Sequence, residues 1–107
     1  MDALAALADP TRRRILELLT GGELAAGELC DQFSVSRPAV SRHLRVLREA
    51  GLVRSRVDGQ RRLYTLDARP LAELDAWLEP YRRFWAQRLD ALDTEIRRGR
   101  RNRRTTT

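Results

Sequence analysis

The chain has 107 residues, enough for one compact domain, and its apolar fraction of 42% is ordinary for a soluble protein. It shows no apolar run near the roughly 20 residues of a membrane span, no secretion leader and only one cysteine, so we expect a cytoplasmic protein. All 21 basic residues are Arg, against 15 acidic residues, and this net charge of +6 suits a polyanionic partner.

The first third of the chain predicts three short helices. Residues 1–8 show apolar side chains at helical spacing and form the first. Asp9 and Pro10 supply an N-cap and a first-turn proline for the second helix, which ends at a Gly-Gly pair. The third helix fits residues 26–33.

Residues 34–62 hold the most informative pattern, because this segment contains eight Arg and only two acidic residues. A serine cap opens a fourth helix over 37–50, and at 100° per residue Val40, Leu44 and Leu47 share its buried face. The opposite, basic face is either an ordinary solvated surface or, as in a helix-turn-helix, the surface that enters the DNA major groove. The candidate DNA contacts of this segment are Ser36, Arg37, Ala39, Ser41, Arg42, His43 and Arg45.

His43 lies at the edge of that apolar face, about 60° from its centre. Two interpretations stay open: the ring is packed or hydrogen bonded at the helix pair, or it contacts a phosphate or base. Metal ligation is not expected, because no second ligand lies near it in the pattern.

A β-hairpin follows over residues 54–66, and its Asp58-Gly59 dipeptide predicts a two-residue connection. That register sets Arg56 opposite Arg61, an arrangement that is unfavourable in an isolated strand pair. It makes sense where phosphates lie between the two side chains, although both can also splay into water. The candidate DNA contacts of this wing are Arg56, Arg61 and Arg62.

From residue 70 to about 98, apolar residues recur at three- and four-residue steps and predict a long helix, which Pro80 should kink or interrupt. Four of the six aromatic residues lie within residues 77–85, where they form either a dimer core or an effector pocket. The tail 97–107, with six Arg and no acid, should be mobile. It is either a solubilising end or an auxiliary phosphate contact.

Three motifs together resemble the ArsR/SmtB family of bacterial winged helix-turn-helix repressors, and the resemblance covers roughly residues 3–96. They are ALADPTRRRILELL (6–19), SRPAVSRHLRVLREAGLV (36–53) and RSRVDGQRRLYTLD (54–67). The resemblance implies a mostly α (α+β) fold with a two-stranded wing, and a homodimer on an inverted-repeat operator of double-stranded DNA. By position it assigns DNA contact to Arg37, Ser41, Arg42, His43 and Arg45. The dimer interface that it implies, through the first and last helices, comprises Leu4, Leu7, Leu78, Tyr81, Phe84, Trp85, Leu89 and Leu92.

The family's metal sites are not reproduced in this sequence. Its Cys-x-Cys pair corresponds to Ala25 and Gly27, and the last helical segment lacks the histidine of a second site. One Cys and one His cannot supply the three or four ligands of a transition-metal site. The resemblance therefore points to the non-metal-sensing branch, with no cofactor. Cys30 is either a structural bystander or a single-thiol redox switch.

Together these patterns predict residues 1–96 as a DNA-binding domain with a C-terminal dimerisation helix, followed by the 97–107 tail. The predicted function is a sequence-specific transcriptional regulator that acts as a dimeric repressor, with its own gene as one candidate target and an unknown effector. The alternative is a protein-interaction module whose aromatic last helix docks a partner that controls DNA binding. An enzyme is not expected, because the sequence offers no paired carboxylates, no nucleophile beside a base and no phosphate-cradling glycine loop.

Overall fold

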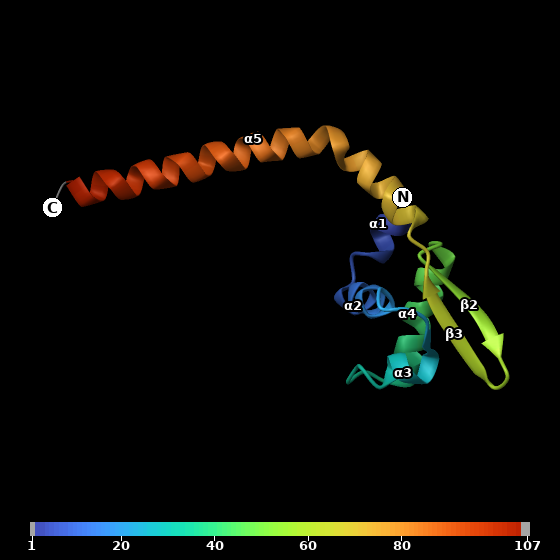
Figure 1. Ribbon diagram of the computed structural model, residues 1–107. Coiled ribbons are helices and arrows are strands. Elements are labelled where there is room, and N and C mark those ends of the chain that lie inside the picture. The colour runs from blue at the N-terminus through green and yellow to red at the C-terminus, as the bar shows by residue number, and fades with distance from the viewer. Residues whose placement is uncertain (1, 106–107) are drawn as a thin grey trace. The chain divides into compact units, whose positions relative to one another are not determined.

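The structure is a computed structural model that describes residues 2–105, with side chains described for residues 2–99. Contacts divide the chain into two compact units, with the boundary between Leu74 and Asp75. The elements in chain order are α1 (Asp2–Ala6), α2 (Pro10–Leu19), β1 (Leu24–Ala25), α3 (Ala26–Cys30), α4 (Arg37–Glu49), β2 (Val53–Asp58), β3 (Arg61–Leu66) and α5 (Arg69–Thr105). Figure 1 labels each of them except the short strand β1.

The predicted capping signals begin and end the helices of the first unit. The Asp9 side chain accepts a hydrogen bond from the Arg12 backbone N–H at 3.0 Å, at the start of α2. At the start of α4, Ser36 Oγ accepts from the Ala39 backbone N–H at 3.3 Å. Gly51, with a φ of +76°, follows the end of α4 and supplies the left-handed turn that a helix terminus needs. The predictions for α2 and α4 are confirmed to within a residue or two.

The core lies between α4, the other helices of the first unit and one face of the sheet. Val40, Leu44 and Leu47 are 0–2% exposed, which confirms the predicted buried face of α4. They pack in one cluster with residues from every other element of that unit, among them Ile15, Leu16, Leu19, Leu29, Leu52, Val53 and Tyr64. Fully burying an aliphatic side chain contributes about 1.5–3 kcal/mol. This cluster therefore fixes the side of α4 that remains in solvent.

The sheet has three antiparallel strands in the order β1-β3-β2, one more than the expected wing. The added strand, β1, pairs Leu24 with Tyr64 and Ala25 with Leu63. A two-residue strand carries no alternation that a sequence pattern could show. The winged helix-turn-helix architecture is otherwise as predicted, and the β2–β3 hairpin runs beside α4 (Figure 1).

The predicted register of the hairpin is wrong by two residues, because the turn lies one residue further along the chain. Asp58 pairs with Arg61, so the two connecting residues are Gly59 and Gln60 rather than Asp58 and Gly59. An Asp-Gly connection of type I′ needs positive φ at both residues. Among the described residues only glycines have a positive φ, and Gly59, at +63°, takes the first turn position as in a type II′ turn. Arg56 therefore lies opposite Leu63, and the expected Arg–Arg pair is replaced by an Asp–Arg pair.

Helix α5 starts in the first unit and forms the second. The helix is continuous through Pro80, so the proline does not interrupt it. It also continues through residues 97–105 of the Arg-rich tail, while residues 106–107 lie outside the described part of the chain. Arginine is a good helix former, and an i,i+4 ion pair of 3.0 Å joins Asp93 to Arg97. No helix within the described residues is long and apolar enough to cross a membrane.

Candidate nucleic-acid interface

The outward face of α4 is formed by exposed polar and basic side chains, because its opposite face is buried in the core. Arg37, Ser41, Arg42 and Arg45 are all exposed. None of the three arginines takes part in the ion pairs found within the described side chains. Guanidiniums near the N-terminal half of a helix suit acceptor pairs on guanine and phosphate oxygens. The structure thus leaves these four predicted residues exposed, with Arg42 and Arg45 opposite the buried face of the helix.

Ser36 and Ala39 lie at the first turn of α4 and are tied to its cap. Ser36 is exposed and Ala39 is half-buried. Because Ser36 Oγ accepts from the Ala39 backbone N–H, the hydroxyl hydrogen stays available to donate to an acceptor such as a phosphate.

His43 faces the junction between α2 and α4. Its side chain is 22% exposed, and Nδ1 lies 3.4 Å from Arg12 Nη1 and 3.8 Å from Asp9 Oδ2. The hydrogen bond from the Arg12 backbone N–H, helped by the charge of Arg12, lowers the pKa of Asp9. Neither Asp9 nor Arg12 was expected beside His43, because periodicity relates only residues within one element.

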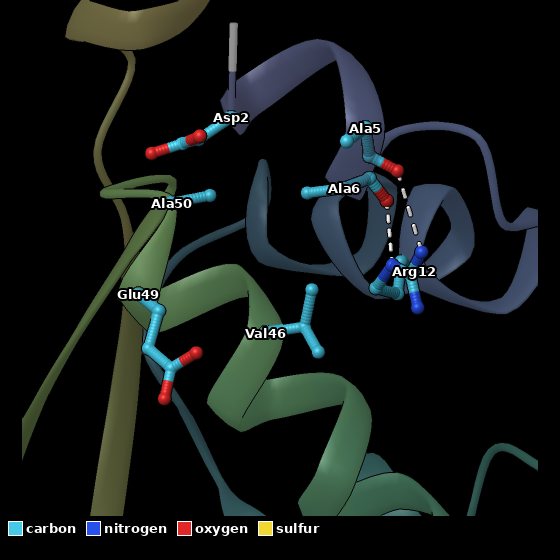
Figure 2. Close-up of a pocket in the computed structure, with 7 residues that line it drawn as sticks. All are labelled: Asp2, Ala5, Ala6, Arg12, Val46, Glu49 and Ala50. Carbon is cyan, nitrogen blue, oxygen red and sulfur yellow. Dashed lines mark hydrogen bonds between the residues drawn. The ribbon is translucent and has the colours of Figure 1, made fainter.

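Arg12 joins three helices. Its Nε donates to Ala6 O at 2.6 Å and its Nη2 donates to Ala5 O at 3.4 Å, so the guanidinium caps the end of α1 (Figure 2). Beside it opens a pocket of about 420 Å³ between α1 and α4, which is lined by Asp2, Ala5, Ala6, Arg12, Val46, Glu49 and Ala50. No sequence signal indicated this pocket.

The three predicted wing residues differ in their surroundings. Arg56 donates from Nε and Nη2 to the Glu23 carboxylate at 3.0 and 2.8 Å, and this hydrogen bonding lowers the pKa of Glu23. Arg61 and Arg62 are exposed near the turn and, as neighbours in a strand, point to opposite faces of the sheet. Arg62 Nη1 donates to Ser55 Oγ at 3.2 Å. Only Arg56 is held by an acidic partner, which sequence reasoning missed.

Asp67 joins the wing to the start of α5. Its carboxylate accepts from Arg54 Nε at 3.0 Å and from Arg69 at 2.8–3.1 Å, through both the side chain and the backbone N–H. The side chain of Asp67 is 9% exposed. The hydrogen bonds from Arg69, with that from Arg54, hold the pKa of Asp67 far below its ordinary range. No sequence pattern had indicated this cluster.

The second unit presents an unusual run of exposed apolar side chains on α5. Trp77, Tyr81, Phe84, Trp85, Leu89, Leu92 and Ile96 are 40–60% exposed. The Trp77 and Tyr81 rings lie 5.1 Å apart, and Arg88 lies over the Phe84 ring at 4.9 Å. Of the other residues expected in a dimer interface, Leu4 is exposed, and Leu7 and Leu78 are half-buried. Large apolar side chains exposed in this number on one helix are typical of an interaction surface.

Within the described residues, no three His, Cys, Asp or Glu side chains gather as metal ligands would. The thiol of Cys30 is half-buried in α3, where it packs against the core.

Comparison with known proteins agrees with this geometry. A family model described as a helix-turn-helix domain matches residues 7–56. The HTH-type transcriptional regulator Rv2034 of Mycobacterium tuberculosis is 53% identical over 87 residues, or 81% of this chain and 78% of the relative. The transcriptional repressor SdpR of Bacillus subtilis is 38% identical over 73 residues, or 68% of this chain and 81% of the relative. The crystal structure of an ArsR family transcriptional regulator matches with a TM-score of 0.73 at 30% identity, covering 79% of this chain and 88% of that one.

Proposed function

The chain belongs to the ArsR family of DNA-binding winged helix-turn-helix transcriptional regulators, and on that premise we propose that it represses transcription as a homodimer on an inverted-repeat operator. One of the two similar regulators is itself named a repressor. Both come from bacteria, in which a repressor meets its promoter in the cytoplasm.

The observation that carries the proposal is the exposed face of α4. Arg42 and Arg45 lie on the side opposite Val40, Leu44 and Leu47, which the core holds in place. Ser41 is exposed on a flank of that side, and Arg37 is exposed at the first turn of the helix. A helix of this kind fits the major groove, where a guanidinium can pair with guanine and a serine hydroxyl can bond a base or a phosphate. In the proposed complex, Arg61 and Arg62 of the wing contact the neighbouring backbone or minor groove.

The proposed dimer uses the apolar side chains of α5. Seven large apolar side chains exposed in one helix favour association, because contact with a second copy removes their apolar surface from water. Two copies would set their α4 helices about 34 Å apart, one turn of DNA, and so match the two halves of an inverted repeat. Bound there, the dimer would block access of the polymerase to the promoter.

The same exposed aromatic surface supports a second candidate, in which a different protein docks on α5 and controls DNA binding. Size-exclusion chromatography with light scattering distinguishes the two. A homodimer of the purified chain favours the first. A monomer that assembles only with a second protein, and changes its operator affinity when it does so, favours the second.

The test of DNA recognition starts from duplex fragments selected by the purified chain. We expect Arg45→Ala to lower affinity for the selected site by about 1–3 kcal/mol if the side chain contacts a base. Arg14→Ala is the control, because Arg14 is an exposed arginine that pairs with Glu17 on α2. With roughly 6–10 phosphates contacted, affinity should fall about 10³–10⁵-fold between 50 and 200 mM salt. Equal affinity for the selected site and random duplex at moderate salt would contradict the proposal.

A further inference from the structure

His43, the single histidine of the chain, joins α2 to the DNA-facing helix α4, with its Nδ1 directed toward Arg12 and Asp9. We propose that Arg12 is a positioning residue that keeps Nδ1 of His43 without a proton, so that Nε2–H is the donor offered to an acceptor atom of the DNA duplex. The inference rests on the proposed function, because it requires α4 to dock on DNA.

The chemistry of arginine decides which tautomer the contact admits. A guanidinium carries five N–H donors and no acceptor, so the contact between Arg12 Nη1 and His43 Nδ1 requires the lone pair of Nδ1. In a neutral imidazole the proton then resides on Nε2. A proton on Nδ1 would instead set two N–H groups against each other.

Asp9 is the competing neighbour, because a carboxylate favours a proton on Nδ1. Its Oδ2 lies 3.8 Å from Nδ1, which is beyond hydrogen-bond distance. The same oxygen already accepts from the Arg12 backbone N–H at 3.0 Å. The Arg12 contact of 3.4 Å is long but satisfies hydrogen-bond geometry, so of the two neighbours it favours the tautomer with its proton on Nε2.

Arg12 can act on His43 because its guanidinium is held independently of the ring. Its bonds to Ala6 O and Ala5 O anchor it at the end of α1, as the dashed lines of Figure 2 show. A side chain fixed by two acceptors loses little further rotamer freedom when it makes a third contact. Residues 8–13 (ADPTRR) thus begin α2 and, through Arg12, also contact a side chain of α4.

A single histidine makes this tautomer directly measurable, because every imidazole signal of a ¹⁵N-labelled sample belongs to His43. Long-range ¹H–¹⁵N correlation spectra are recorded on the protein without DNA, at alkaline pH values over which the imidazole signals no longer change with pH. For the wild type we expect Nδ1 at the position of a nitrogen without hydrogen and Nε2 at that of an N–H nitrogen. Arg12→Met should move both signals toward those of a ring that exchanges between tautomers.

Arg13→Met is the matched control for these spectra. Arg13 Nη1 donates to Leu7 O and Ala8 O at 2.8 and 3.3 Å, so its loss removes similar bonds at the α1–α2 connection. The control should leave both nitrogen signals unchanged. A substantial proton population on Nδ1 in the wild type, or an Arg12→Met spectrum that matches the wild type, overturns the proposal. The wild-type spectrum decides alone if Arg12→Met does not fold.

Measurements of operator binding distinguish control of the His43 tautomer by Arg12 from a general structural effect of losing Arg12. Gln in place of His43 offers a side-chain N–H near the former Nε2 position and has no tautomer to control. We expect Arg12→Met to weaken operator binding about fivefold with His43 present, the worth of one hydrogen bond, and less than about twofold in the His43→Gln background. Equal losses in both backgrounds overturn the inference alone. A wild type that binds no selected operator overturns the proposed function, and the inference with it.

Discussion

Arg56 carries the same guanidinium as Arg61 and Arg62, but Glu23 holds it by two hydrogen bonds. The charge pattern of the hairpin made these three arginines equivalent candidates for DNA contact. They differ because Glu23 comes 33 positions earlier in the chain and reaches the wing only in the folded protein. An arginine that already has a carboxylate partner must exchange it for a phosphate, and so contributes less to binding than one whose partner is water.

Glu23→Gln is therefore expected to strengthen binding to random duplex DNA. The released Arg56 adds one phosphate contact, so the slope of log affinity against log salt should become steeper by about one unit. The control is Glu17→Gln, which removes the same charge from a pair with the exposed Arg14 on α2. Fluorescence anisotropy at several salt concentrations measures both slopes. Identical slopes for the two variants would show that Arg56 plays no part in the contact.

At the scale of elements, the Asp67 cluster connects three parts of the fold. Asp67 ends the hairpin, Arg54 lies in β2 and Arg69 begins α5. The carboxylate is ionised in the folded state over a wider pH range than in the unfolded chain, because its hydrogen bonds to the two arginines depress its pKa. Its contribution to stability is thus present above the unfolded pKa of about 3.9 and is lost as the pH falls toward the folded value.

Asp67→Asn should lower the melting temperature at pH 7, and this difference should narrow at pH 3. The reason is that at pH 3 the Asp67 carboxylate is mostly protonated in the unfolded wild-type chain but still ionised in the folded protein, whereas the amide of the variant does not titrate. Circular dichroism melts at both pH values measure the effect. The control is Asp31→Asn, which changes an exposed aspartate outside the ion pairs of the described residues. A difference that stays constant with pH would contradict the role given to ionised Asp67.

Sequence patterns predicted the elements whose signals are local. The spacing of Val40, Leu44 and Leu47 gave α4 its buried face, and the caps Asp9 and Ser36 gave two helix starts. The hairpin register was missed because one glycine supports either of two tight turns, depending on whether it comes first or second. The contacts of His43, Arg56 and Asp67 were missed because they join residues from different elements, about which periodicity carries no information.

At the scale of the whole molecule, the exposed apolar residues of α5 should decide the association state. Leu89→Asp places a charge among them and is expected to raise the dimer dissociation constant by at least about tenfold, since burying an unpaired carboxylate is strongly unfavourable. Operator binding should weaken in parallel, although α4 is unchanged. Gln87→Asp adds the same charge on the other side of α5 and should leave the light-scattering mass unchanged. A dimer that tolerates Leu89→Asp would point to another interface.

The division of α4 between inward and outward side chains has a consequence for how such proteins diversify. The residues that keep the helix in place, Val40, Leu44 and Leu47, are buried, whereas the ones that we propose contact DNA are exposed. Replacing Ser41, Arg42 or Arg45 should alter folding stability by no more than about 0.5 kcal/mol, as for other surface positions. After gene duplication, a few changes on that side could give each copy a different set of target promoters while the scaffold stays the same.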